Sequence, residues 1–315
     1  MILATVKDAG PDGRLVVVSP ERDRCAPAPV ATLQQAIEQW DEVARGLAAV
    51  RDFPEALDLS RLAAPLPRAW QWLDGSVYST HAELMQVAFG HDPIESDRPL
   101  MYQGMSDRFL GPTEDVPLPS EADGIDFEGE FGVIVDRVPM GTGPEAALGH
   151  IKLLVQVNDW SLRTLAPGEM KTGFGWIQAK PACSMAPFAV TPDELGDAWR
   201  NGRVCLDLHI DWNGKSFGRA NGEPMQFGFG ELIAHAARTR DLAAGTVIGS
   251  GTVSNANYAE VGSSCISEVR AIEMIADGKP ATGFMRFGDR VRMEARAADG
   301  SAPFGAIDQK VVPCS

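Results

Sequence analysis

Short strand-like runs dominate the chain beyond residue 66, and long helical patterns between them are rare. The runs with strand character are DFEGEFGVIVD, IKLLVQVND, VCLDLHIDWNG, TVIGSGTVS, CISEVRAIEMI and DRVRMEARA. A doubly wound parallel sheet needs a long helix between consecutive strands, so that fold fits the pattern poorly. One helix is predicted over FGELIAHAARTRDLAAG, with Gly245 as its C-terminal glycine cap. The pattern therefore predicts an α+β fold that is mainly β.

The first 66 residues are predicted to form a separate unit. The runs MILATV and RLVVVS are joined by KDAGPDG, whose Pro-Asp-Gly turn favours a hairpin. VATLQQAIEQWDEVARGLAAV has apolar residues at helical spacing, with Thr32 as a candidate N-cap. The Pro-rich stretch AAPLPRAWQW is typical of a linker. We therefore expect a small N-terminal α+β domain over residues 1–66 and a larger domain over residues 67–315.

Composition disfavours several kinds of partner and location for this protein. The chain has 315 residues, is 44% hydrophobic and carries a formal charge of -15, which disfavours nucleic acid and anionic membranes as partners. No apolar run approaches the roughly 18 residues that span a membrane, and Lys7 and Asp8 interrupt the place of a signal peptide. Five cysteines are scattered without a CxxC pair, which is typical of reduced thiols. We expect a cytoplasmic protein.

Carboxylates gather in GIDFEGEFGVIV, residues 124–135. Because a strand alternates its faces, Asp126, Glu128 and Glu130 are predicted to share one face. A divalent cation would turn this repelling row into a stable cluster, since hard cations prefer carboxylate oxygens. Asp159, at the end of the predicted strand LLVQVND, is a candidate third ligand beside Glu128 and Glu130. The alternative is an edge strand whose E-x-E pair faces solvent.

A candidate general base lies in WLDGSVYSTHAELMQVAFG. Thr80 and Glu83 match the S/T-x-x-E capping box, which places His81 at the first position of a helix. The partial positive charge of a helix N-terminus disfavours a protonated imidazole, and a neutral imidazole suits a general base. Asp74 lies seven residues earlier, on the segment leading into this turn. The alternative is that His81 is a surface residue near the cap.

Two further stretches have residue types that suit a reaction site. Lys180 stands in GFGWIQAKPACSMAP, where a lysine could stabilise an enolate or a carboxylate, or simply be solvated. IGSGTVSNAN is a turn rich in glycine and hydroxyl groups. Its backbone could approach a ligand closely, or it could be an ordinary loop.

Taken in order, these stretches resemble the fumarylacetoacetate hydrolase family. The order is D-x6-H, then MYQG, then E-x-E, then NDWSxR, then a Gly-rich segment with K-P-x-x-S, then SGTVS. The resemblance covers the chain from about residue 67 to the C-terminus. It implies a mixed β-roll in the larger domain, a divalent cation (Mg²⁺, Mn²⁺ or Ca²⁺), a small keto-acid substrate and a homodimer.

The resemblance also implies roles for individual residues. The family's metal ligands match four acidic positions: Asp74, Glu128, Glu130 and Asp159. Its catalytic and substrate-contacting groups match six positions: His81 as the water-activating base, Glu268 as its partner, the active-site Lys180, and Arg163, Tyr102 and Thr252 near the substrate. Ser184 matches a position that helps to bind a second cation in some members. Asp126 matches no ligand and is interpreted as a residue that leads into the strand.

The chain departs from the family pattern where the eukaryotic hydrolases contact their substrate. Ala166 stands for a glutamine, Met170 and Ser76 for tyrosines, and Gly90 for an arginine. The resemblance therefore implies that the metal and base machinery is retained while the substrate is not fumarylacetoacetate itself.

The reaction expected from the resemblance is hydrolysis of a carbon–carbon bond in a β-diketo acid. His81 would activate a water molecule for attack on a carbonyl, and an enolate would depart, stabilised by the cation and Lys180. A decarboxylase, hydratase or isomerase acting on a related keto acid with the same metal site is the alternative within the family.

Two alternatives come from other classes. Gly141-x-Gly143-x-x-Ala146, with Asp159 eighteen residues after the first glycine, imitates the dinucleotide-binding fingerprint of an NAD-dependent oxidoreductase. Against it, DRVPM separates these glycines from the preceding strand, and Pro144 stands inside the supposed phosphate turn. A non-catalytic scaffold stabilised by a metal ion is the other alternative.

Overall fold

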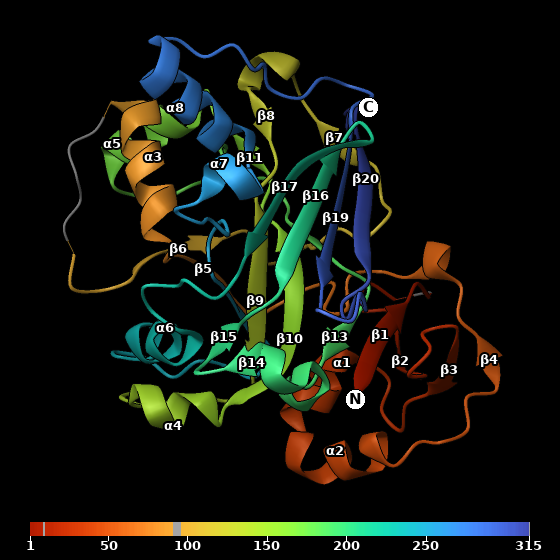
Figure 1. The fold of residues 1–315 in the computed structure, drawn as a ribbon. Helices are drawn as coiled ribbons and strands as arrows, with labels where there is room; N and C mark the ends of the chain where they lie inside the picture. The colour runs from red at the N-terminus through yellow and green to blue at the C-terminus, as the bar shows by residue number, and fades with distance from the viewer. Residues whose placement is uncertain (9, 91–95, 315) are drawn as a thin grey trace.

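A long mixed sheet runs through the computed structural model, which describes residues 1–8, 10–90 and 96–314 (Figure 1). The strands of this sheet, in spatial order, are β4 (Glu55–Ala56), β3 (Arg24–Pro27), β2 (Arg14–Val18), β1 (Ile2–Val6), β13 (Ala189–Val190), β10 (Ile151–Asn158), β9 (Gly129–Val135), β18 (Thr246–Gly249), β5 (Trp72–Ser76) and β6 (Leu100–Gly104), with β12 (Ser184–Met185) beside β10. The pairing is antiparallel except between β18 and β5, which run parallel.

A second antiparallel sheet packs against the first. It consists of β17 (Lys215–Asn221), β16 (Asp207–Trp212), β19 (Arg290–Arg296), β20 (Ala306–Pro313) and β7 (Val116–Leu118), the last pairing parallel to β20. Two short pairs complete the strands of the described residues: β8 (Ile125–Asp126) with β11 (Ser161–Leu162), and β14 (Trp199–Arg200) with β15 (Arg203–Val204). Gln156 ties the two large sheets together, since its side chain bonds the Met293 carbonyl and the Ala295 N–H.

Helices in the described part of the chain are short. They are α1 (Leu33–Glu38), α2 (Trp40–Ala48), α3 (Ser79–Phe89), α4 (Pro144–Leu148), α5 (Ala166–Thr172), α6 (Phe229–Ala236), α7 (Tyr258–Val261) and α8 (Ile266–Asp277), with 3₁₀ turns at Leu59–Arg61, Glu121–Asp123 and Pro192–Ala198. Figure 1 shows α3, α5 and α8 gathered at one end of the sheets, near β5 and β6. None of the helices in these ranges has the length and apolar character needed to cross a membrane. The α+β, mainly β fold predicted from the sequence is confirmed.

The hydrophobic core has two parts, one on each face of the main sheet. Val133 and Leu154 of the main sheet pack with Ile210 and Met293 of the second sheet. On the opposite face, residues such as Ile37 belong to a second cluster that includes the helices of the N-terminal segment. Because β9 and β10 are covered on both faces, every residue of β9 is buried. The interpretation of E-x-E as part of a solvent-facing edge strand is therefore wrong.

The N-terminal segment has the elements predicted for it. β1 and β2 form the expected antiparallel hairpin, and the Thr32 hydroxyl accepts the Gln35 N–H at 3.2 Å as the N-cap of α1. The single predicted helix is two helices, α1 and α2, because Gln39 leaves helical geometry at φ -114° and ψ 28°. β1 pairs with β13, so the N-terminal strands extend the main sheet. The domain boundary at residue 66 stays a prediction.

Two predicted elements differ from the structure. CISEVRAIEMI is not a strand but most of helix α8, whose buried residues Ser267, Glu268 and Ala271 have helical spacing. Helix α6 ends at Ala236 rather than near Gly245, because the following chain turns away and Leu242 pairs with Val138. The predicted cap glycine instead adopts φ +89° in the turn before β18.

Candidate active site

Three acidic side chains meet where neighbouring strands of the main sheet end. Asp74 lies on β5, Glu130 lies on β9, and Asp159 directly follows β10. Strand β18 lies between β5 and β9, and β10 lies on the other side of β9, so the sheet itself brings these positions together. One carboxylate oxygen of each residue lies within 4.8 Å of the other two. We call this group the carboxylate cluster.

The carboxylate cluster is buried and holds several mutually repelling acidic groups. Asp74 is 3% exposed, and Glu130 and Asp159 are fully buried. Burial and the neighbouring Asp159 raise the pKa of Asp74, and burial and Asp74 raise the pKa of Glu130. Among the residues that the structure describes, no N–H or hydroxyl group donates to either carboxylate oxygen of Glu130. Buried oxygens without donors fit a hard divalent cation, so the residues present suit an Mg²⁺, Mn²⁺ or Ca²⁺ ion.

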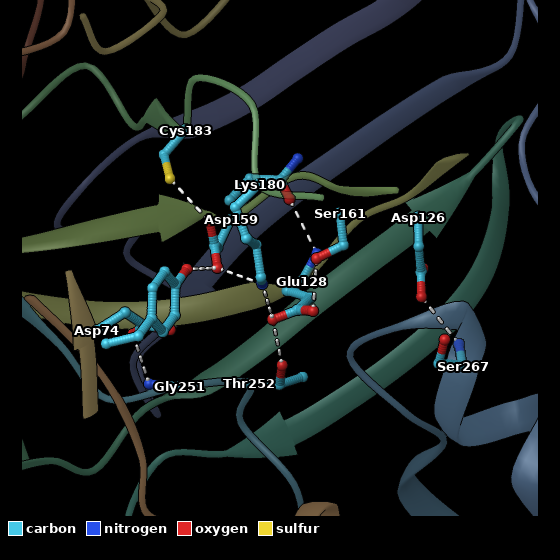
Figure 2. A network of polar contacts seen from close by, with 12 residues as sticks. Asp74, Asp126, Glu128, Asp159, Ser161, Lys180, Cys183, Gly251, Thr252 and Ser267 are labelled. Carbon is cyan, nitrogen blue, oxygen red and sulfur yellow. Dashed lines mark hydrogen bonds and ion pairs between the residues drawn. The ribbon is translucent and has the colours of Figure 1, made fainter. Parts of the chain in front are cut away.

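Glu128 lies beside the carboxylate cluster but is engaged by other groups (Figure 2). Its Oε1 atom accepts the Ser161 hydroxyl at 2.8 Å and lies 2.6 Å from Nη2 of Arg163. Its Oε2 atom accepts the Thr252 hydroxyl at 2.9 Å and lies 3.1 Å from Nζ of Lys180. Burial opposes ionisation, but Arg163 and Lys180 outweigh it and hold the pKa of Glu128 below its usual range. The structure thus brings together three of the four predicted metal ligands.

Lys180 links Glu128 to the carboxylate cluster. Its Nζ atom lies 2.5 Å from Oδ2 of Asp159, the same oxygen that accepts the Tyr102 hydroxyl at 2.6 Å. The Cys183 thiol donates to the other Asp159 oxygen at 2.8 Å. Burial favours a neutral amine, but Asp159 and Glu128 outweigh it and raise the pKa of Lys180. Lys180 is therefore a fixed cation at the site, not a solvated surface lysine.

His81 and Glu268 form a buried pair between α3 and α8. Nδ1 of His81 lies 2.8 Å from Oε1 of Glu268, and the two residues are 9% and 0% exposed. The interpretation of His81 as a surface residue is therefore wrong. The predicted capping box is also wrong: α3 begins at Ser79 with Tyr78 as N-cap, which makes His81 the third helical residue. Tyr78 is buried and its hydroxyl donates to the Gly222 carbonyl, which fixes where the helix starts.

Asp126 does not belong to the row of carboxylates that strand alternation predicted. The strand breaks at Phe127 and Glu128, so Asp126 lies on β8, opposite Ser161 of β11, while Glu130 lies on β9. The two short segments belong to different sheets. Alternation across the break therefore carries no information about which way Asp126 points.

Asp126 instead fixes the start of α8, a role that the sequence did not indicate. One of its carboxylate oxygens accepts the backbone N–H of Ile266 at 2.7 Å. The other accepts the backbone N–H of Ser267 at 3.0 Å (Figure 2). Nε of Arg163 donates to the same carboxylate at 2.8 Å. Since Glu268 lies in the first turn of α8, Asp126 sets the position of the residue that bonds to His81. No local pattern in the sequence links these residues, which are 140 positions apart.

Family models match both parts of the chain. The fumarylacetoacetate (FAA) hydrolase C-terminal model matches residues 71–312, and the fumarylacetoacetase N-terminal domain 2 model matches residues 1–68. The chain belongs to the fumarylacetoacetate hydrolase family. This confirms the resemblance drawn from the order of the motifs.

Relatives in the fumarylacetoacetate hydrolase family have different activities. A 2,4-didehydro-3-deoxy-L-rhamnonate hydrolase of Sphingomonas sp. (strain SKA58) is 29% identical over 163 residues, which are 51% of this chain and 54% of that protein. The human mitochondrial oxaloacetate tautomerase FAHD2A is 25% identical over 186 residues, 56% of this chain and 54% of that protein. The chain thus spans about half the length of the curated relatives it matches. The family includes hydrolases, isomerases and tautomerases.

A solved structure shares the fold. Maleylpyruvate hydrolase of Sphingobium sp. SYK-6, in complex with manganese(II) and pyruvate, has a TM-score of 0.68 and 19% sequence identity, and the match covers all of both chains. At this identity the likeness establishes the fold alone. The fold is thus one that holds a divalent cation in another protein.

A cavity of about 310 Å³ opens beside the residues of this chain that were matched to the family's catalytic positions. Predicted site residues that line it are Asp74, His81, Tyr102, Glu128, Arg163, Lys180 and Thr252. Three of the four positions that depart from the family pattern also line it, namely Ser76, Ala166 and Met170. Gly90 is not among the lining residues and ends α3 at φ +63°. Ser184, matched to a second cation position, instead accepts the Trp160 indole N–H at 2.9 Å.

The dinucleotide-binding alternative is wrong. The fingerprint requires parallel strands joined through a helix, whereas β9 and β10, which flank Gly141 and Gly143, are antiparallel. The helix between them, α4, is only five residues long. The segment is the connection between two antiparallel neighbouring strands.

Proposed function

We propose that the chain is a metal-dependent hydrolase that cleaves a carbon–carbon bond in a β-diketo acid. The observation that carries this proposal is the buried His81–Glu268 pair, whose histidine lines the same cavity as Asp74 of the carboxylate cluster. A general base and a site for a Lewis-acidic cation at one cavity are the two parts that this hydrolysis needs.

Asp74, Glu130 and Asp159 would hold the divalent cation. When bound, such an ion would polarise the substrate carbonyl and lower the energy of the developing enolate. The bound pyruvate and manganese(II) of maleylpyruvate hydrolase support a keto acid at such a site. Glu128 would contribute through Lys180, which it holds next to Asp159.

His81 would take the proton from the attacking water. A neutral His81 that donates its Nδ1–H to the Glu268 carboxylate, 2.8 Å away, would have Nε2 as the nitrogen able to accept a proton. Glu268 is itself held by the start of α8, which Asp126 fixes. Hydroxide attack at the carbonyl distant from the carboxylate makes a new carbon–oxygen bond and breaks the adjacent carbon–carbon bond. The electron pair passes to the enolate of a 2-keto acid, which then takes up a proton at carbon.

Lys180 would stabilise negative charge on the substrate. Its ammonium group is held by Asp159 and Glu128 and lines the cavity, so it costs no reorganisation when charge develops. Arg163 is different, because Asp126 and Glu128 already occupy its guanidinium group. We assign Arg163 a positioning role between α8 and Glu128, and we assign Tyr102 and Thr252 to the substrate-facing wall.

A keto–enol tautomerase is the second candidate. The human oxaloacetate tautomerase relative favours it, since proton transfer through an enolate uses a similar cation and base. The two candidates differ in one product: hydrolysis consumes water and releases a second acid, whereas tautomerisation releases nothing.

The test is a screen of β-diketo acids, beginning with acetylpyruvate, with Mn²⁺ or Mg²⁺ present. Loss of enol absorbance would be followed together with acid products by mass spectrometry. We expect cleavage that is lost in Glu130→Gln and in His81→Asn but kept in the exposed control Glu42→Gln. Full activity of Glu130→Gln, or decay of the enol without acid products, would contradict the hydrolase assignment.

The homodimer and the cytoplasmic location stay predictions. Light scattering coupled to gel filtration would measure the mass, with twice the chain mass of 33.8 kDa as the expected result.

A further inference from the structure

A second group of metal-ligating side chains lies apart from the carboxylate cluster. Atoms of His81, Cys265 and Glu268 that could bind a metal ion all lie within 4.8 Å of one another, and all three residues are buried. The group shares no residue with the carboxylate cluster. It offers one nitrogen, one sulfur and one oxygen, whereas the carboxylate cluster offers only oxygens. We call it the mixed-ligand group.

Two groups in the mixed-ligand group have unused bonding capacity. Oε2 of Glu268 is buried without a hydrogen-bond partner among the described residues, while Oε1 bonds to His81. Cys265 is the N-cap residue of α8, but its side chain does not cap the helix. The Ser267 N–H, one of the groups that an N-cap side chain would bind, is instead bonded to the carboxylate of Asp126. Because the Cys265 thiol does not cap the helix, it is available as a metal ligand.

The mixed-ligand group and the carboxylate cluster have ligand atoms that suit different metal ions. Imidazole, thiolate and carboxylate are zinc ligands, and zinc sites with three protein ligands keep a fourth position for water or substrate. Mg²⁺ and Mn²⁺ prefer all-oxygen surroundings, which the carboxylate cluster provides. A Cys265 thiolate and a Glu268 carboxylate carry two negative charges, which match one Zn²⁺ ion. His81 lines the cavity, so an ion would reach the group at this imidazole, whereas Cys265 and Glu268 are fully buried.

We propose that Zn²⁺ binds to Cys265, Glu268 and His81 and inhibits the enzyme by occupying its general base. On binding, the Cys265 thiol gives its proton to solvent and a zinc–sulfur bond forms, with no change of oxidation state. The zinc ion would coordinate the imidazole of His81 and the Glu268 carboxylate that orients it, so His81 could no longer accept a proton from water. The inhibition rests on the proposed function, whereas the binding does not.

Cobalt(II) in place of zinc tests the binding without any substrate. With the carboxylate cluster saturated by Mg²⁺, we expect one cobalt ion per chain and a thiolate-to-cobalt charge-transfer band in the near ultraviolet. Cys265→Ala and Cys265→Ser should lose the band, and the equally buried control Cys25→Ala should keep it. Circular dichroism would verify that each variant is folded. A band that persists in both Cys265 variants would place the thiolate elsewhere, at Cys183 beside Asp159, and would overturn the proposal.

Zinc inhibition of the Mg²⁺-loaded enzyme tests the consequence. We expect inhibition that added Mg²⁺ does not relieve, a chelator reverses, and Cys265→Ala weakens by at least about tenfold. Equal inhibition of wild type and Cys265→Ala, relieved by Mg²⁺, would place zinc in the carboxylate cluster and overturn the proposal. The protein could turn over no keto acid and still show a cobalt band that is lost in the Cys265 variants. That result would contradict the proposed function but support the zinc site.

Discussion

Replacing Asp126 with asparagine tests whether the Asp126 carboxylate has a structural role or binds the metal ion. Asp126 is fully buried, and its two oxygens accept two backbone N–H groups of α8 and the Arg163 guanidinium. An asparagine keeps the shape but has one acceptor oxygen, so at least one of these donors loses its partner. The negative charge opposite Arg163 is lost as well.

The size of the effect follows from these contacts. A hydrogen bond to a charged group contributes about 1.5–3 kcal/mol, and breaking a buried ion pair costs about 3–5 kcal/mol. Because Asp126 and Arg163 are nearly or fully buried, solvent screens their interaction little. We expect Asp126→Asn to lower the free energy of unfolding by about 3–5 kcal/mol and to reduce turnover, because Glu268 is no longer held against His81.

Denaturant unfolding, steady-state kinetics and Mn²⁺ titration of Asp126→Asn and Glu130→Gln form the assay. Asp126→Asn should keep its Mn²⁺ affinity while losing stability, and Glu130→Gln should lose Mn²⁺ affinity. An Asp126→Asn protein with wild-type stability and weakened Mn²⁺ binding would refute the reasoning and make Asp126 a metal ligand.

Further predictions concern the metal site and the base. Since Glu130 has a folded-state pKa above its ordinary 4.5, folding of the metal-free protein takes up protons, and stability should fall as pH rises above that value. Thermal unfolding of the metal-free protein between pH 5 and 8 should show this fall, and Mn²⁺ should raise the unfolding temperature by an amount that grows with pH. Metal-free Glu130→Gln should be more stable than wild type at pH 8. An unfolding temperature that does not change with pH would count against Glu130 as a metal ligand. His81→Asn should lower kcat by about 10²–10⁴-fold without changing Mn²⁺ affinity, measured by kinetics and titration, and an unchanged kcat would exclude His81 as the base. Lys180→Met should lower kcat and leave Asp159 and Glu128 without their shared cation, so its unfolding temperature should fall; a fully active, equally stable variant would contradict the role given to Lys180.

Residues in short ordered motifs could be found from the sequence. Lys180, Asp159 and His81 stand in motifs whose order carries the family resemblance, and the structure places them around one site. Strand alternation predicted that Glu128 and Glu130 share one face, but β9 begins only at Gly129, and of the two glutamates Glu130 alone belongs to the carboxylate cluster. The difference arises from Arg163 and Lys180, which reach Glu128 from other parts of the chain.

Features set by distant contacts could not be predicted. CISEVRAIEMI has the apolar content of a strand, and its helix begins where Asp126, 140 residues earlier, binds its first N–H groups. The start of α3 depends on Tyr78 reaching Gly222, which no capping pattern near His81 encodes. The pairing of β1 with β13 likewise joins segments that the Pro-rich stretch was predicted to separate.

The most direct test of the central claim is cleavage of acetylpyruvate in oxygen-18 water by the Mn²⁺-loaded enzyme. If His81 activates water for attack on the distal carbonyl, the acetate released by wild type will carry solvent oxygen, and His81→Asn will release almost none. Conversion of the enol to the keto form without labelled acetate would contradict the hydrolase account and assign the site to tautomerisation.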